Sequence, residues 1–225
     1  MGVGEFARDA ARQLAAPEWR RPALLLFLLL AVTQVILALS KPDPGQPPGA
    51  AFAVAGLVRG LGLIWVSVAM FRAALESPRR RWLPDGGFWL YFLLSLLALA
   101  ASAAAALLAT GLPGDSRIVV VQLVAVLLIA PLTVWMVAAA VERPLALAPR
   151  FSGISSWLPP LLLLAILVVV PLASLHAHFS LRLIEAAGQG LVFWGMALVD
   201  GVLSTFVALL TLALRVAVYR SVARG

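Results

Sequence analysis

The sequence predicts an all-α fold, a polytopic membrane helix bundle of six transmembrane helices with both termini in the cytoplasm. Composition is the first observation behind this prediction. Of the 225 residues, 63% are hydrophobic and 12% are charged, which is about half the charged fraction of an ordinary soluble domain. The second observation is a series of apolar runs long enough to cross a hydrocarbon layer. The third is the placement of arginine between those runs, because basic residues favour the cytoplasmic side of a membrane.

These runs divide the chain into three parts: a cytoplasmic N-terminal segment (1–21), a transmembrane domain (22–219) and a cytoplasmic tail (220–225). The six spans are predicted, in order, at about residues 22–39, 51–71, 88–110, 118–141, 157–175 and 191–219. The last of these runs is longer than a ~30 Å hydrocarbon layer requires at ~1.5 Å per residue, so the sixth helix is expected to tilt or protrude.

The N-terminal segment is polar and weakly amphipathic. Phe6, Ala10 and Leu14 recur at helical spacing, which indicates either a short interfacial helix that ends at Pro17 or a frayed terminus. The first apolar run follows a basic leader as in a signal peptide, but its core is of spanning length. We therefore expect a retained helix.

The segments between the spans have the composition of loops. They are a Pro/Gly-rich linker (41–49), an arginine-rich segment (72–83), a short Gly/Pro turn (111–115) and a second internal segment (142–156). Residues 176–190 are predicted to form an external segment with amphipathic character. Pro131 is predicted to interrupt the fourth span, since proline removes a helical hydrogen bond.

Basic residues are distributed very unequally between the two predicted faces. The outer segments hold Lys41, Arg117 and Arg182, whereas the inner segments hold twelve arginines: Arg8, Arg12, Arg20, Arg21, Arg72, Arg79, Arg80, Arg81, Arg143, Arg150, Arg220 and Arg224. This bias fixes the predicted orientation. Sixteen of the seventeen basic residues are arginine, which we interpret as the composition of a GC-rich bacterial genome. The predicted location is therefore the bacterial cytoplasmic (inner) membrane.

The formal net charge of +7 identifies the expected partners. The basic residues lie at the ends of apolar runs and form no continuous basic face, so nucleic acid is not an expected partner. Anionic lipid head groups at the cytoplasmic face are expected, and a protein partner in the membrane is a further candidate. The candidate head-group contacts are Arg79, Arg80, Arg81, Arg20 and Arg21.

Two ionisable residues are predicted to lie inside the spans. Arg59 and Asp200 each lie roughly 12–14 Å from the outer face at ~1.5 Å per residue. A charge at that depth needs a partner, so the sequence predicts an Arg59–Asp200 ion pair. In the alternative, the sixth span begins near Gly201 and Asp200 is interfacial.

A polar seam is predicted along the sixth span. Ser204, Thr211 and Arg215 share a helical stripe with Asp200, and Gln122 and Gln34 on other spans could hydrogen-bond into the same interior. Such a seam either lines a path for a lipid or small molecule or holds the helices together. The second interpretation is favoured.

His176, His178 and Glu185 form a candidate outer-face site. The i, i+2 spacing of the two histidines suits a bidentate metal site poorly if the backbone is helical. The chain has no cysteine and no hydrolase, zincin or phosphate-loop motif. We therefore predict no catalytic residues, metal or cofactor, and the sequence leans against an enzyme.

Some stretches of the last hundred or so residues resemble bacterial six-span proteins of the glycerophosphoryl diester phosphodiesterase membrane-domain-like family. The resemblance rests on Pro131-Leu132, the run Ala138–Pro144, Trp157-Leu158 and the closing Ala217–Arg220. It implies a helical membrane domain. It implies no phosphodiesterase activity, which in that group belongs to a separate soluble domain.

Three functional hypotheses follow. The first is a non-catalytic bacterial inner-membrane protein that acts through lipid or protein contacts. The second is a small transporter or solute-binding membrane subunit with an outward-facing polar site near Arg59 and Asp200. The third is a lipid-acting membrane enzyme, which would need His176, His178, Glu185 and Asp200 to converge.

Overall fold

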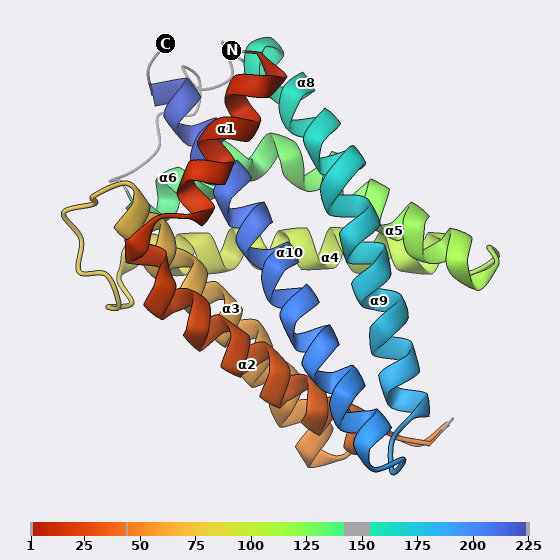
Figure 1. Ribbon diagram of the computed structural model, residues 1–225. Coiled ribbons are helices and arrows are strands. Elements are labelled where there is room, and N and C mark those ends of the chain that lie inside the picture. Colours follow the sequence, from red (N-terminus) through yellow and green to blue (C-terminus); the bar gives the residue numbers. More distant parts are fainter. Residues whose placement is uncertain (1, 44, 142–153, 224–225) are drawn as a thin grey trace.

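The computed structural model describes residues 2–43, 45–141 and 154–223, which form an all-helical membrane bundle (Figure 1). Within these ranges there is no β-strand. Six helical spans are long and apolar enough to cross a membrane. The fold class predicted from the sequence is therefore confirmed.

Helices follow one another with short 3₁₀ or π turns at three places. In order, the elements are α1 (Val3–Leu14), a 3₁₀ turn (Pro17–Trp19), α2 (Arg20–Leu39), α3 (Ala50–Ala74), α4 (Gly86–Leu108), α5 (Gly114–Ile129), a 3₁₀ turn (Ala130–Leu132), α6 (Thr133–Val141), α8 (Ile154–Leu164), a π turn (Ala165–Val169), α9 (Val170–Glu185) and α10 (Leu191–Ala223). The fourth span comprises α5, α6 and the 3₁₀ turn between them, and Pro131 lies in that turn. The predicted interruption of this span at Pro131 is confirmed.

The fifth span differs from the prediction. The sequence predicts an end near residue 175 and an external segment at 176–190, but α9 continues as a helix to Glu185. His176 and Ser180 lower the hydropathy of this stretch, yet both lie on the side of α9 that contacts α10. The polar residues therefore satisfy one another between two helices and do not end the helix.

The sixth helix is also longer than predicted at its C-terminal end. It continues to Ala223, so Arg220, the first residue of the predicted tail, is still helical. Its guanidinium donates a hydrogen bond from Nη2 to the carbonyl oxygen of Ala74 at 2.8 Å. This bond joins the end of α10 to the end of α3.

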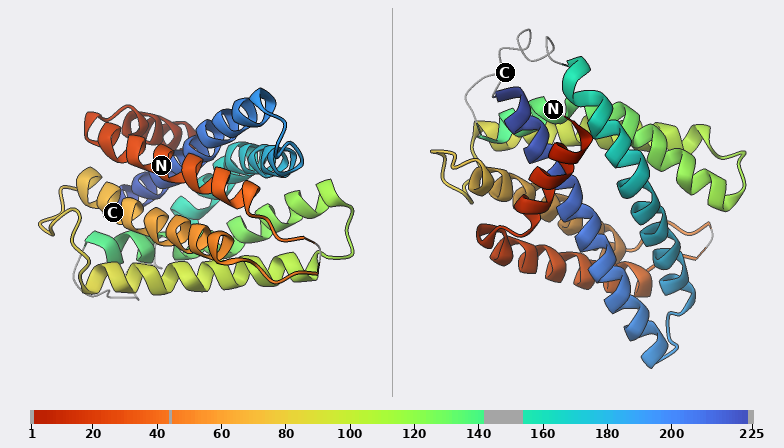
Figure 2. Two further views of the ribbon diagram at one scale, coloured as in Figure 1. Left: turned by 90° about the horizontal axis from the view of Figure 1, so that it is seen from below. Right: turned by 45° about the horizontal axis from the view of Figure 1, so that its top comes forward.

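Three helical hairpins make up the bundle, namely α2–α3, α4–α5 and α9–α10. In Figure 1, α10 crosses the middle of the molecule, between the α2–α3 pair and the α8–α9 pair. Helix α10 packs against α1, α2, α6 and α9. Helix α4 lies on the side of the molecule opposite α2, as the views in Figure 2 show.

Loops on the predicted inner face lie together at one end of the bundle. Arg72 at the end of α3 bonds the carbonyl oxygen of Ala140 near the end of α6, and Arg220 bonds Ala74. The ends of α3, α6 and α10 and the start of α4 therefore share one end, as the alternation of the spans predicts. Which side of the membrane this end faces remains a prediction. Arg143, Arg150 and Arg224 lie outside the described residues.

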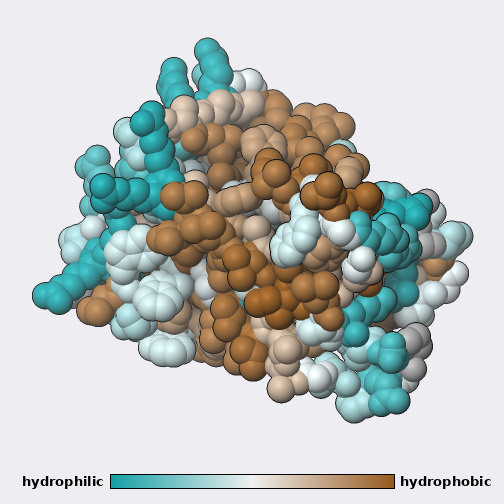
Figure 3. Space-filling view, turned by 60° about the horizontal axis from the view of Figure 1, so that its bottom comes forward, coloured by the Kyte–Doolittle hydropathy of each residue, from teal (hydrophilic) through white to brown (hydrophobic). Residues whose placement is uncertain are grey.

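The lateral surface of the bundle is apolar. Leu97, Leu107, Leu108 and Leu191 are among many large aliphatic side chains that are more than half exposed. Figure 3 shows a broad hydrophobic surface with hydrophilic residues gathered on either side of it. Such a surface is unfavourable in water and suits contact with lipid chains.

Of the two alternatives for the N-terminal segment, helix α1 confirms a helix over a frayed terminus, while its predicted position at the membrane interface stays a prediction. Its apolar face rests on protein, since Phe6 is fully buried and Ala10 is 3% exposed. Their neighbours are in α10 and α8, against which α1 packs. The helix ends at Leu14, before Pro17.

Candidate functional site

Asp200, on α10, is the most deeply buried acidic residue among the described ones. Its carboxyl group is fully buried and lies within hydrogen-bond distance of His176, with 2.7 Å between Oδ1 and Nδ1. The hydroxyl of Ser180 lies 3.2 and 3.1 Å from the two carboxyl oxygens. Two residues one turn apart on α9 thus hold one acid on α10.

Asp200 lies within α10, between two and three turns after the helix begins at Leu191. Because α10 is longer than one membrane crossing requires at ~1.5 Å per residue, the helix bounds do not decide between a mid-membrane and an interfacial Asp200, and both stay predictions. His176 is the partner that the carboxylate finds, and its side chain is 22% exposed.

Arg59, on α3, does not form the direct ion pair predicted from the sequence. Its Nη1 donates to the carbonyl oxygen of Leu30 at 3.1 Å, to Gln34 Oε1 at 2.9 Å and to Thr33 Oγ1 at 3.5 Å. The ion pairs of the described residues do not include Arg59–Asp200, although the two charges attract one another through space. The prediction failed because residue spacing gives the depth of a side chain but not the direction in which its helix face points.

The three residues of the predicted outer-face site are not brought together. His176 binds Asp200, and Glu185 pairs with Arg182 on its own helix at 3.0 Å. His178 is two residues from His176 on a helix and therefore points in a different direction. No group of three metal-ligating side chains occurs within residues 2–43, 45–141 and 154–223.

The predicted polar seam divides into two parts. Gln34 belongs to the Arg59 cluster, and the Ser204 hydroxyl donates to the carbonyl oxygen of Gly201 within α10. In contrast, Thr211, Arg215 and Gln122 line one cavity of about 190 Å³. The sequence therefore grouped residues that serve different sites.

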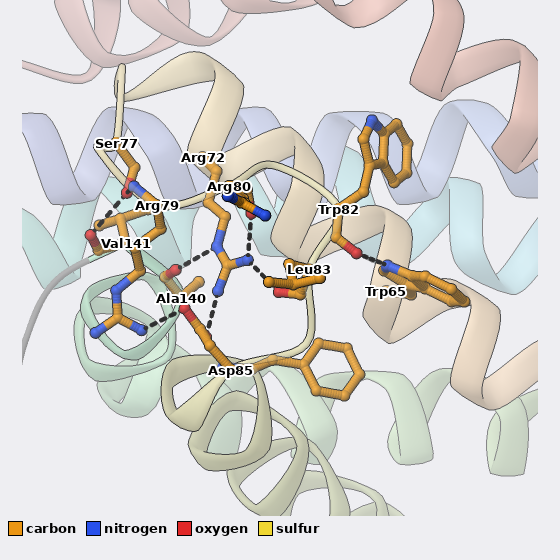
Figure 4. A network of polar contacts seen from close by, with 11 residues as sticks. Trp65, Arg72, Ser77, Arg79, Arg80, Trp82, Leu83, Asp85, Ala140 and Val141 are labelled. Carbon is orange, nitrogen blue, oxygen red and sulfur yellow. Dashed lines mark hydrogen bonds and ion pairs between the residues drawn. The ribbon is translucent and has the colours of Figure 1, made fainter.

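Arg72, near the end of α3, binds the loop between α3 and α4, a structural role that was not predicted from the sequence. Its side chain is 1% exposed and lies between this loop and the end of α6 (Figure 4). Nε donates to the carbonyl oxygen of Ala140 at 2.9 Å, and Nη1 donates to those of Arg80 at 2.9 Å and Leu83 at 2.7 Å. Nη2 binds Asp85 Oδ1 at 2.6 Å. The planar guanidinium is suited to this because its donors point in several fixed directions.

Asp85 joins the arginine cluster to the start of α4. It is the N-cap of α4 and accepts the backbone N–H of Phe88 at 3.0 Å. Its second oxygen binds Arg79 Nη1 at 3.1 Å. Burial raises the pKa of Asp85, but the Phe88 hydrogen bond and the charges of Arg72 and Arg79 outweigh it, so the net pKa lies below the ordinary value.

Further contacts fix the same loop. The Ser77 hydroxyl donates to the carbonyl oxygen of Val141 at 2.9 Å, and Trp65 Nε1 donates to that of Trp82 at 2.9 Å (Figure 4). The loop is therefore held to α3 by Trp65 and Arg72, to α6 by Ser77, and to α4 by Asp85.

The five candidate lipid contacts fall into two groups. Arg79 is partly buried and pairs with Asp85. The other four are exposed: Arg20, Arg21, Arg80 and Arg81. Sequence position alone did not separate Arg72 and Arg79, which bind the protein, from Arg80 and Arg81. The available signal was Asp85 followed by two glycines, a helix-start pattern that also supplies a carboxylate.

The fold and these contacts define a multi-pass helical membrane protein with a fixed loop at one end and polar residues within the bundle. Comparison with protein families, curated proteins and solved structures finds no significant match to this chain. The resemblance to the six-span family therefore remains a prediction. Part of its motif, Glu142–Pro144, lies outside the described residues.

Proposed function

We propose that the protein is a non-catalytic membrane protein that acts through contacts with anionic lipids, and with a protein partner, at the arginine-rich end of its bundle. The observation that carries this proposal is the division among the arginines of one loop. Arg72 and Arg79 bind the loop itself, while Arg80 and Arg81 next to them are exposed. A loop fixed by internal arginines presents its remaining arginines in a defined position, which favours recognition of head groups.

Neighbouring residues support the same role. Arg20 and Arg21 at the start of α2 are exposed, and the 3₁₀ turn just before them packs against α3. Trp82 and Trp89 are 39% and 55% exposed, and tryptophan is favoured at the level of lipid head groups. Basic and aromatic residues thus occur together where the spans end.

Orientation and location are part of the proposal. With the arginine-rich end in the cytoplasm, both termini are cytoplasmic and the membrane is the bacterial inner membrane, whose cytoplasmic leaflet attracts basic residues. The support is the arginine asymmetry between the two ends of the bundle.

Lipid binding can be tested with purified protein in nanodiscs. We expect phosphatidylglycerol to remain bound to the protein in native mass spectrometry and to raise its unfolding temperature relative to phosphatidylcholine. The double variant R80Q/R81Q should lose most of this preference. The matched control R117Q/R182Q removes two exposed arginines at the other end of the bundle and should keep it. Equal preference for the two lipids in the wild type, or equal loss in both double variants, would refute the proposal.

A second candidate function is a solute-binding or transport subunit, which the Asp200 site favours. A fully buried carboxylate that binds a histidine within a span is a common feature of proton and solute pathways. The test is proton flux into proteoliposomes that contain a pH-sensitive dye, under an imposed membrane potential. Flux in the wild type that D200N abolishes would support this function. Identical traces for wild type, D200N and empty liposomes would exclude proton transport through the site.

A further inference from the structure

A second candidate site lies in the half of the bundle formed by the fourth, fifth and sixth spans. It is the cavity of about 190 Å³ that contains Arg215 and Gln122. Along the fourth span its lining runs from Gln122 to Thr133, a distance of roughly 16 Å at ~1.5 Å per residue. The cavity is therefore long in the direction of the helices. It shares no residue with the exposed arginines of the loop or with the Asp200 site.

Most of the lining is apolar and several of its residues are small. Ala125, Ala130, Ala165 and Ala173 contribute only a methyl group each. Between them lie larger aliphatic side chains, namely Val126, Ile129, Leu161, Val169, Val207 and Leu214. An apolar cavity of ~150 Å³ accommodates a benzene-sized molecule. A hydrocarbon segment therefore fits this space in both polarity and size.

Two departures from α-helical geometry border the cavity. Ala130 belongs to the 3₁₀ turn of the fourth span, and Ala165 and Val169 belong to the π turn of the fifth span. Turns of this kind often mark functional sites in helices. In membrane proteins, interrupted helices are tolerated where they face protein or a cavity.

Arg215 supplies a charge at this cavity. It lies in α10 and is partly buried. Its Nη1 donates one hydrogen bond, to the hydroxyl of Tyr91 at 3.3 Å. No carboxylate lies within ion-pair distance of it in the described part of the chain, so its other N–H groups have no partner there. A cation between apolar helices is costly unless an anion approaches it.

Other polar groups of the lining suit an anion or its hydration. The amide of Gln122 has no hydrogen-bond partner among the described residues and can donate. The hydroxyl groups of Thr133 and Thr211 donate to the carbonyl oxygens of Ile129 and Val207, at 3.3 and 2.8 Å, so they offer only acceptor lone pairs. Arg215 is therefore the principal donor available to a ligand.

We propose that this cavity binds a single-chain anionic amphiphile. The carboxylate of a fatty acid would pair with the Arg215 guanidinium in two parallel hydrogen bonds, and the hydrocarbon chain would follow the alanine-rich lining between the π turn and α5. The ligand supplies the negative charge that the bundle does not provide for Arg215. The site is independent of lipid binding at the exposed arginines, so either proposal can fail alone.

The experiment uses the full chain in phosphatidylcholine nanodiscs with a photoreactive diazirine derivative of lauric acid. Labelled peptides are identified by mass spectrometry, and unlabelled lauric acid competes for the site. Dodecanol and dodecyltrimethylammonium serve as neutral and cationic competitors of the same chain length. We expect saturable labelling of residues 161–173 and 207–215, with competition by lauric acid only.

Three variants test the two halves of the site. R215Q removes the charge and should weaken labelling about tenfold or more, because a charge-assisted hydrogen-bonded pair is lost. A165L fills the cavity while keeping Arg215, and should weaken labelling to a similar extent. The matched control R182Q removes an exposed arginine of α9 that pairs with Glu185, and its labelling should equal that of the wild type.

Every outcome decides the question. Equal competition by dodecanol, unchanged labelling in R215Q or A165L, or labelling confined to other helices would each overturn the proposal. If inorganic anions alone displaced the probe and lauric acid did not, the site would bind a small anion and the proposal would likewise be wrong. If R215Q fails to fold, the result for A165L decides.

Discussion

The replacement of Arg72 by lysine tests the most extensive polar network in the structure. Lysine keeps the positive charge and much of the length of arginine, but it concentrates its three donors on one nitrogen. Arg72 uses three separate nitrogens to reach the backbone oxygens of Ala140, Arg80 and Leu83 and the carboxylate of Asp85. A single ammonium group cannot occupy all of these positions, so R72K leaves at least two acceptors without their donor.

The expected magnitude follows from those lost bonds. An acceptor that loses its partner in a buried site costs about 1–3 kcal/mol. Two such acceptors would cost about 2–6 kcal/mol, and water that reaches the exposed side of the loop at Leu83 makes the lower half of this range the expected one. In the matched variant R79Q, loss of the partly exposed ion pair between Arg79 and Asp85 is expected to cost about 0–1 kcal/mol.

The assay is unfolding by a denaturing detergent in mixed micelles, followed by tryptophan fluorescence, with thermal unfolding as a second probe. R72K should be destabilised by at least about 1 kcal/mol more than R79Q. Equal unfolding midpoints for R72K, R79Q and the wild type would refute a stabilising role of the Arg72 hydrogen bonds in the loop.

Three further predictions concern single side chains. Gly87→Ala should cost about 1–3 kcal/mol because the added Cβ would clash with a backbone carbonyl of α6, whereas Gly86→Ala, whose Cβ meets nothing within 4 Å, should unfold like the wild type in the same detergent titration. The lowered pKa of Asp85 means that its contribution to stability is present above the unfolded-state pKa of ~3.9 and is lost as the pH falls through the lower folded-state value. In the wild type, the detergent concentration at the unfolding midpoint should accordingly decrease as the pH is lowered below about 4. If Asp85 is responsible, the D85N variant should not show this decrease. D200A should destabilise the protein by about 1–3 kcal/mol because His176 loses its buried partner, and a double-mutant cycle with H176A that gives no coupling energy would contradict this.

Much of the architecture could be predicted because it follows from one-dimensional properties. Span length and apolar composition locate the six helices, and the alternation of loops places the ends of α3, α6 and α10 together, as the Arg220–Ala74 and Arg72–Ala140 bonds confirm. The interruption of the fourth span at Pro131 could likewise be predicted, because a proline lacks the N–H of a helical hydrogen bond at its own position. Which side the arginine-rich end faces was predicted from charge and is not determined by the arrangement of the helices.

The polar contacts between helices could not be predicted in the same way. The Arg59–Asp200 pair was inferred from equal depth, but Arg59 points toward α2 and Asp200 toward α9. The correct pairing carried a signal that was not used. His176 and Ser180 are four residues apart, so on a helix they share one face, whereas an external segment would not place them together.

The buried N-terminal helix bears on how the chain assembles. Phe6 has no exposed surface, and its helix α1 packs against α10 and α8, so these residues contact a helix that is synthesised much later. At ~5–20 residues per second, roughly 200 residues of synthesis separate the two, which is a delay of about 10–40 s. Residues 3–14 can therefore dock on α10 only after the sixth span has been synthesised. A fusion placed at the N-terminus would disturb that step and leave insertion itself unaffected.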